Sequence, residues 1–190
     1  MGKKEAFEKL TGGIISCQRC PLYKTAIKAV PGEGNPEAEV FFIGEAPGFW
    51  EDQKGKPFVG EAGQLLDKLL TLIGLKREEV FIGNAINHRP PQNRDPKPVE
   101  IEACRFWLWE QLKIIDPKLI VTLGRFALWE FFPDSQISKV HGQKITCELN
   151  GQKKTVIPCF HPAAVLYRRQ TLASLEEDFL QIKLFLRKMD

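Results

Sequence analysis

Short apolar runs that alternate with helical patterns are the feature that most constrains the fold of this chain. Runs typical of β-strands cover residues 39–43, 80–84, 119–123 and 154–159. Three of these runs are followed by apolar residues at helical spacing. This alternation predicts an α/β protein, specifically a three-layer α/β/α sandwich around a mainly parallel sheet of four strands.

Composition predicts one domain over residues 1–190, with 43% hydrophobic and 27% charged residues. No apolar run approaches the length that spans a membrane. Five cysteines without a secretion signal favour a reducing compartment, so we expect a monomeric cytoplasmic protein with no membrane association. The net charge is only +3, although small arginine clusters at Arg89/Arg94 and Arg168/Arg169 could contact phosphates.

Three polar motifs follow the carboxyl ends of the predicted strands. A glycine-rich turn at residues 44–48 follows the first strand, Asn84 ends the second, and His161 follows the fourth. In open parallel sheets, ligands bind beyond these strand ends. We therefore expect the three motifs to meet at one edge of the sheet, which carries more weight than any motif alone.

The side chains at this edge suit the hydrolysis of a base–sugar bond in DNA. Glu51 and Asp52 lie on the glycine-rich loop, where a carboxylate can orient water or stabilise a cationic sugar. Phe58 can stack on a base, and the Asn84 amide can pair with its edge. His161 can stabilise charge on a leaving base. Taken singly, each residue is more often structural.

A second group of residues predicts a metal site. Cys17 and Cys20 form a C-x-x-C pair followed directly by Pro21, as in iron–sulfur ligand runs. Cys104 in a predicted helix and His88 upstream of it are the candidate remaining ligands. Spacing alone admits either an iron–sulfur cluster or a zinc ion held by three cysteines and one histidine.

Ordered motifs over nearly the whole chain resemble family 4 uracil-DNA glycosylases, the iron–sulfur type of bacteria and archaea. The matching segments are Cys17-x-x-Cys20-Pro21-Leu22, Gly32-Glu33-Gly34-Asn35, Gly44-Glu45-Ala46-Pro47-Gly48 with Glu51-Asp52, Gly55-Lys56-Pro57-Phe58-Val59-Gly60, Arg89-Pro90-Pro91 with Asn93-Arg94, Cys104, Leu123-Gly124 and Phe160-His161-Pro162. The resemblance implies an α/β/α fold, a [4Fe–4S] cluster and removal of uracil from DNA by base flipping.

The resemblance also implies roles for individual residues. Glu51 would position water and His161 would contact the O2 side of uracil, as the two catalytic residues. The remaining implied contacts are uracil reading by Asn84, stacking by Phe58, pocket lining by Glu45 and Ala46, DNA insertion by Leu166, and phosphate contacts by Arg168 and Arg169.

His88 departs from the family pattern, which usually has cysteine there as a cluster ligand. Uracil-DNA-crosslinking relatives carry histidine at this place, but their basic, histidine-bearing insertion is missing here, so we expect ordinary turnover. We expect a cluster held by Cys17, Cys20, Cys104 and His88, with a raised potential because imidazole is neutral. The rival forms are a cluster with an open iron and a three-iron cluster.

Three other functions fit the same residues less well. The chain could bind uracil-DNA tightly or covalently, or excise another deaminated base such as hypoxanthine. It could be a DNA-binding module that a metal stabilises and that has no enzymatic activity. It could also hydrolyse free nucleotides. Convergence of Glu51, Asn84 and His161 in one pocket would favour the glycosylase.

Overall fold

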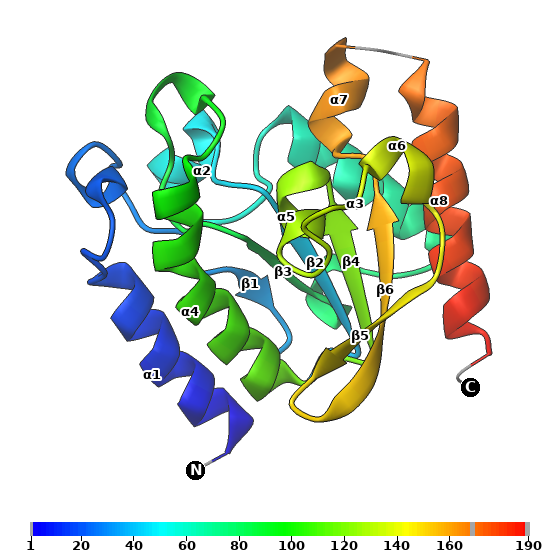
Figure 1. Cartoon of the computed structure of the whole chain (residues 1–190), viewed down its shortest axis with the longest axis horizontal. Helices are drawn as coiled ribbons and strands as arrows, with labels where there is room; N and C mark the ends of the chain where they lie inside the picture. The colour runs from blue at the N-terminus through cyan, green and yellow to red at the C-terminus, as the bar shows by residue number, and fades with distance from the viewer. Residues whose placement is uncertain (1, 168–169, 189–190) are drawn as a thin grey trace.

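The computed structural model describes residues 2–167 and 170–188, which form a six-stranded sheet between two layers of helices (Figure 1). The strands run in the order β1-β3-β2-β4-β6-β5. Their bounds are β1 Glu33–Gly34, β2 Val40–Gly44, β3 Phe81–Asn84, β4 Leu119–Leu123, β5 Ile145–Leu149 and β6 Gln152–Cys159. The helices are α1 Lys3–Ile15, α2 Phe49–Lys54, α3 Glu61–Ile73, α4 Pro98–Ile115, α5 Arg125–Trp129, α6 Ile137–Val140, α7 Pro162–Tyr167 and α8 Thr171–Leu186.

The predicted α/β class and three-layer sandwich are confirmed, whereas the expected count of four strands is wrong. The four predicted strands form the parallel centre, β3-β2-β4-β6, and an antiparallel strand pairs with each edge of it. Strand β1 has two residues, too few to show an alternating pattern. Strand β5 is the first arm of a hairpin whose turn contains Asn150 at a φ of 53° and Gly151 at 74°.

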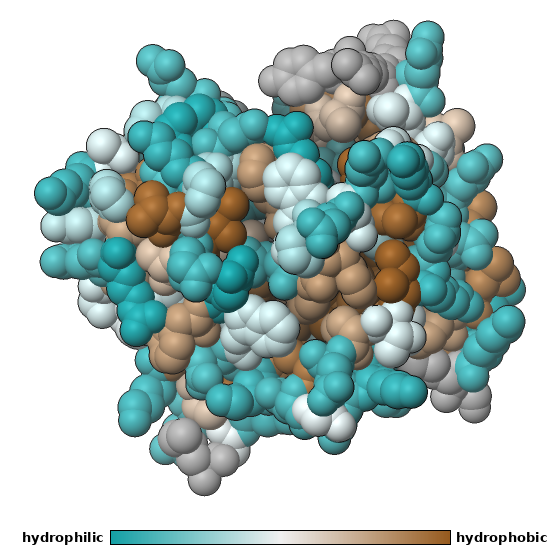
Figure 2. All heavy atoms as spheres, viewed as in Figure 1, coloured by the Kyte–Doolittle hydropathy of each residue, from teal (hydrophilic) through white to brown (hydrophobic). Residues whose placement is uncertain are grey.

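Alternating side chains of the central strands bury the two faces of the sheet against different helices. Phe42 and Val121 belong to an apolar cluster with α3, α7 and α8. Phe41 and Ile120 face the other way and pack with α1, α4 and α5. Figure 2 shows hydrophilic residues over much of the visible face, with smaller apolar patches between them. Among the described helices, none is both long and apolar enough to span a bilayer.

The parallel strands place their carboxyl ends at one end of the molecule. In Figure 1, the arrows of β4 and β6 point towards the end at which α7 lies, and α2 is at the same end. Gly44 at the end of β2 pairs in register with Asn84 at the end of β3. This register places two of the three strand-end motifs, the glycine-rich turn and Asn84, side by side at one edge of the sheet.

Close packing of α3 against the loop before it yields the first prediction. A β-carbon on Gly63 would lie 1.8 Å from the carbonyl oxygen of Phe58, so Gly63→Ala must displace the backbone of that loop. We expect the free energy of unfolding to fall by about 1–3 kcal/mol, as in other overpacked sites. Urea denaturation followed by circular dichroism measures the change.

Gly12→Ala is the matched control, because a β-carbon on this exposed glycine of α1 meets no atom within 4 Å. We expect this change to stabilise the chain by up to about 1 kcal/mol, the difference in helix propensity between the two residues. Equal stability of Gly63→Ala and the original chain would contradict the observed packing.

Candidate active site

A pocket of about 280 Å³ lies at the carboxyl ends of the parallel strands. It brings together the six residues that the sequence placed in a catalytic or substrate-binding role. The lining residues are Glu45, Ala46, Pro47, Gly48, Glu51, Phe58, Ala62, Asn84, Pro90, Asn93, Arg94, His161 and Ala163. Three loops, which follow β2, β3 and β6, supply most of this wall.

Gly44 allows two of the pocket side chains to approach each other. A β-carbon at this position would lie 2.5 Å from Oδ1 of Asn84 and 2.7 Å from the ring of Phe58. Atoms at such distances overlap, so only glycine fits here. The missing side chain at the end of β2 therefore leaves room for the Asn84 amide and the Phe58 ring to approach each other.

Phe58 is held in an unusual backbone conformation. Its φ is 51°, in the left-handed region that bulky residues rarely adopt. Nη1 of Arg77 donates a hydrogen bond to its carbonyl oxygen over 3.2 Å, and Nη2 donates to the carbonyl of Pro57. Gly63 packs against the same carbonyl. Strain of this kind persists only where surrounding contacts enforce it, and here it fixes the ring at the pocket wall.

Glu51 lies in α2 with its two carboxylate oxygens in different situations. Oε1 accepts hydrogen bonds from the backbone N–H groups of Val59 at 2.8 Å and Gly60 at 2.9 Å. Oε2 faces Gly48, where a β-carbon would lie 2.8 Å away. One oxygen is thus anchored by the backbone, and the carboxylate lines the pocket in a fixed orientation.

His161 presents a neutral ring with a defined tautomer. Nδ1 accepts a hydrogen bond from the backbone N–H of Ala163 over 3.1 Å, which assigns the proton of the neutral imidazole to Nε2. Burial lowers the pKa of His161 to about 4, although the negative charge of Glu51 acts in the opposite direction. The ring lies nearly parallel to that of Phe58, with centroids 5.7 Å apart. Gly124 makes room for it, since a β-carbon there would lie 3.1 Å from Cβ of His161.

Asn84 supplies a polar group that lacks a partner. The side chain is 2% exposed, and its Nδ2 has no hydrogen-bond partner in the described structure. An unsatisfied buried donor is costly, by about 1–3 kcal/mol. A ligand that offers an acceptor oxygen in the pocket would remove this cost.

Glu45 and Ala46 are fixed by the segment that follows β3. The Glu45 carbonyl accepts a hydrogen bond from the N–H of Ile86 over 3.1 Å. Burial, with a contribution from nearby Asp95, raises the pKa of the Glu45 carboxyl to about 7. Ala46 packs against the apolar cluster that contains Cys20. The loop after β2 is therefore anchored on its side away from the pocket.

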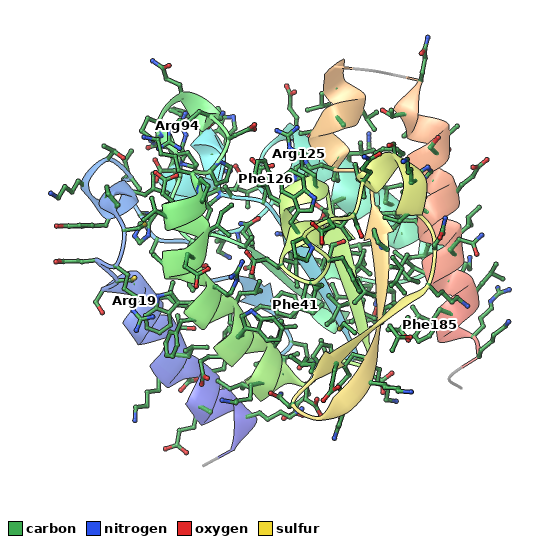
Figure 3. The ribbon with its side chains drawn as sticks, in the orientation of Figure 1. Arg19, Phe41, Arg94, Arg125, Phe126 and Phe185 are labelled. Carbon is green, nitrogen blue, oxygen red and sulfur yellow. The ribbon has the colours of Figure 1, made fainter. Side chains whose placement is uncertain are left out.

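The sequence assigned no pocket role to Pro90, Asn93 and Arg94, which the structure places on the lining. Figure 3 shows Arg94 in the loop that leads into α4. Its guanidinium donates two hydrogen bonds to Glu100, at 2.9 and 2.6 Å. One sequence signal could have indicated where Glu100, the partner of Arg94, lies. Glu100 is the third residue of a helix that begins at Pro98, and a glutamate at that position accepts a hydrogen bond from the backbone N–H of the residue before the helix, here Lys97.

The predicted DNA-contact residues are only partly described. Leu166 lies in α7 directly after the His161 segment and is 48% exposed. Arg168 and Arg169 lie outside the described residues. Arg89, from the other arginine cluster, lies over the ring of Phe49 with its guanidinium carbon 5.1 Å from the centroid.

The three predicted cysteine ligands are neighbours on the other side of the loop after β2. Cys20 and Cys104 share a buried cluster, and a hydrogen bond from the Cys104 thiol lowers the pKa of Cys20 to about 6. That same hydrogen bond and burial raise the pKa of Cys104. Sγ of Cys17 accepts a hydrogen bond from Nε1 of Trp107 over 3.1 Å.

His88 adjoins this group and has an unsatisfied atom. The residue is 5% exposed, and its buried Nδ1 has no hydrogen-bond partner in the part of the chain that the structure describes. Together with Cys17 it lines a cavity of about 480 Å³. Within residues 2–167 and 170–188, no group of three or more His, Cys, Asp or Glu side chains is arranged to hold a single metal ion. The donor set is soft and buried, as in the thiolate sites of both zinc and iron–sulfur proteins.

Comparisons with known proteins find relatives that match most of the chain. Residues 31–183 match the family model described as the uracil DNA glycosylase superfamily. A type-4 uracil-DNA glycosylase of Archaeoglobus fulgidus is 48% identical over 183 residues, which cover 94% of this chain and 92% of the relative. A protein of the same description from Thermotoga maritima is 42% identical over 98% of this chain and 97% of its own length. One from Saccharolobus solfataricus is 49% identical over 90% and 82%.

The environment of His161 predicts its protonation. We expect the imidazole to remain neutral, with the proton on Nε2, down to about pH 5, one unit above its pKa of about 4. Glu51→Gln should lower this pKa further, because it removes the negative charge that favours the imidazolium. Nitrogen-15 NMR of the imidazole across the pH range measures both effects.

Glu148→Gln, on the exposed face of β5, is the control and should leave the His161 titration unchanged. An imidazolium signal for His161 at neutral pH would show that the ring is not held as the structure has it.

Proposed function

The chain belongs to the type-4 family of the uracil-DNA glycosylase superfamily, and we propose that it hydrolyses the bond between uracil and deoxyribose in DNA, leaving an abasic site. The observation that carries the proposal is the convergence of Glu51, Asn84 and His161 on one pocket. A carboxylate at the sugar and a donor at the departing oxygen would favour this reaction, and an amide at the base edge would select the base. The side chains that meet in the pocket support these three roles.

Recognition of uracil begins when the nucleotide leaves the stack and enters the pocket. Phe58 stacks on the base, at the wall where its backbone is fixed. The unpartnered Nδ2 of Asn84 donates to O4 of uracil, and the amide oxygen accepts from N3–H. Cytosine carries an amino group in place of O4, so it would leave Nδ2 unpaired.

Cleavage makes the sugar cationic and the base anionic. The Nε2–H group of neutral His161 donates to O2 of uracil and stabilises the negative charge that develops there. Glu51 stabilises the sugar and orients water towards C1′ with the carboxylate that Val59 and Gly60 hold in place. Both groups are preorganised by backbone hydrogen bonds, so little rearrangement is needed.

Contacts to the rest of the DNA come from the segment after His161. Leu166 is exposed on α7 and can fill the space that the flipped base leaves. Arg168 and Arg169 follow it in sequence and would contact phosphates. We also propose that the chain forms one domain and acts as a monomer in the cytoplasm, where its five free cysteines stay reduced.

The decisive experiment is excision from a uracil-containing oligonucleotide, followed by alkaline cleavage and a denaturing gel. We expect more than one product per protein molecule. Glu51→Gln should slow excision by about 10²–10⁴-fold, because it removes the charge but keeps the oxygen that accepts from Val59 and Gly60. Thermal unfolding should be nearly unchanged.

Glu148→Gln again serves as the control and should excise at the original rate, since its side chain is exposed on β5. A Glu51→Gln protein with the original rate would remove Glu51 from the mechanism. A slowly migrating protein–DNA band without free product would instead indicate the binding or crosslinking function.

The buried sulfur group supports a [4Fe–4S] cluster held by Cys17, Cys20, Cys104 and His88. Such a cluster takes one protein ligand for each iron, so its ligands stand farther apart than those of a zinc ion. Nδ1 of His88 has no hydrogen-bond partner among the described residues, and the residue lines a cavity together with Cys17; both observations support the imidazole as the fourth ligand. When bound, the cluster ties the segment after α1 to α4 and to the loop after β3.

Histidine ligation predicts a spectroscopic signature. In the reduced protein, purified without oxygen, pulsed EPR should show a nitrogen bound directly to iron. His88→Cys should retain the iron and lose that signal, because it restores an all-sulfur ligand set. Metal analysis of both proteins distinguishes iron from zinc.

A cluster that shows no bound nitrogen in the original chain would exclude His88 as a ligand. Zinc in place of iron would exclude an iron–sulfur cluster and would leave the proposed roles of the pocket residues unchanged.

A further inference from the structure

Two large aromatic side chains are exposed at the first two positions of α2. Phe49 is 47% exposed and Trp50 is 53% exposed. They lie in sequence between Gly48 and Glu51, which both line the pocket. Apolar surface of this size is costly to leave in water, and neither ring belongs to a buried cluster of the described residues. Neither the core nor the proposed chemistry accounts for them.

The two rings form a defined pair beside the pocket wall. Their centroids are 5.1 Å apart and their planes make an angle of 79°. The Trp50 indole packs beside Gly60, where a β-carbon would lie 3.3 Å from it. The N–H of Gly60 also anchors the Glu51 carboxylate. The pair therefore adjoins the place where the sugar of the target nucleotide would lie.

Positive charge flanks both rings. The Arg89 guanidinium lies 5.1 Å from the Phe49 centroid, and Nζ of Lys54 lies 6.0 Å from that of Trp50. Nε of Arg89 donates a hydrogen bond to Oδ1 of Asn93 over 2.7 Å, and the carboxylate oxygen paired with its guanidinium, on Asp52, is 4.0 Å away, so its charge is only weakly neutralised. The other oxygen of Asp52 accepts from two backbone N–H groups. Exposed aromatic rings flanked by cations are typical of sites that bind single-stranded nucleic acid. Unpaired bases stack on the rings, and the cations neutralise the phosphates.

We propose that Phe49 and Trp50, with Arg89 and Lys54, form a stacking platform for an unpaired base next to the flipped uracil on the same strand. The identity of the partner, a uracil-containing DNA strand, rests on the proposed function, because the platform adjoins the pocket that the uracil enters. Stacking is tolerant of base identity, so the platform favours unpaired DNA around the uracil over a particular sequence.

Binding measurements test the platform separately from catalysis. The probe is a fluorescein-labelled single-stranded oligonucleotide with one 2′-fluorinated deoxyuridine, which resists excision, and the readout is fluorescence anisotropy. We expect Phe49→Ala and Trp50→Leu each to weaken binding by about tenfold, as for the loss of one stacked base. Trp50→Phe should retain most of the affinity, because a phenyl ring still stacks. The maximal excision rate at saturating uracil-DNA should change less than the affinity.

Phe106→Ala is the matched control. Phe106 is 45% exposed, forms a similar edge-to-face pair with Trp107, and has the Arg19 guanidinium 4.2 Å from its centroid. It lies on α4, away from the pocket, and Figure 3 shows Arg19 well apart from Arg94. Its replacement should leave the affinity unchanged.

The outcomes separate the two proposals. Original affinity in both Phe49→Ala and Trp50→Leu would overturn the platform, whether or not the protein excises uracil. Equal losses in Trp50→Phe and Trp50→Leu would also overturn it, because stacking would not be the cause. Failure of the original chain to excise uracil, with probe binding still sensitive to Trp50, would overturn the proposed reaction and retain the platform.

Discussion

The absence of a side chain at Gly44 is the constraint on which the pocket depends. Parallel pairing sets Gly44 beside Asn84, and the close turn before α3 brings the ring of Phe58 over the same place. Any β-carbon there would overlap both groups. The sheet register thus fixes the amide, and the helix packing fixes the ring. Neither element alone would produce a pocket shaped for a flat polar ligand.

The pocket carries costs that a bound base would offset. Phe58 has a strained backbone, Nδ2 of Asn84 has no hydrogen-bond partner among the described residues, and His161 is buried in a neutral form. Arg77 and Gly63 hold the backbone of Phe58 in place, and the N–H of Ala163 holds the ring of His161. In the proposed mechanism, groups held in this way would stabilise the charge that develops during cleavage with little reorganisation of the surroundings.

Sequence patterns predicted the central strands and the edge at which the site lies, because strand ends of a parallel sheet meet by topology. They did not predict β1, whose two residues carry no periodic pattern. The left-handed φ of Phe58 also gave no sequence signal, since it is imposed by contacts with α3 and Arg77. The role of Arg94 on the pocket wall depends on its pairing with Glu100, a tertiary contact.

The sulfur group and the pocket are coupled through one short loop. Ala46 lines the pocket and also packs against the cluster of Cys20, Leu22, Ile86 and Cys104. The N–H of Ile86 binds the carbonyl of Glu45, so both ends of this contact are fixed by backbone. A metal cluster on these cysteines would therefore stiffen the loop that begins the pocket wall and leads to Glu51. The proposed iron–sulfur cluster would thus have a mechanical role in a hydrolytic reaction, which moves no electrons.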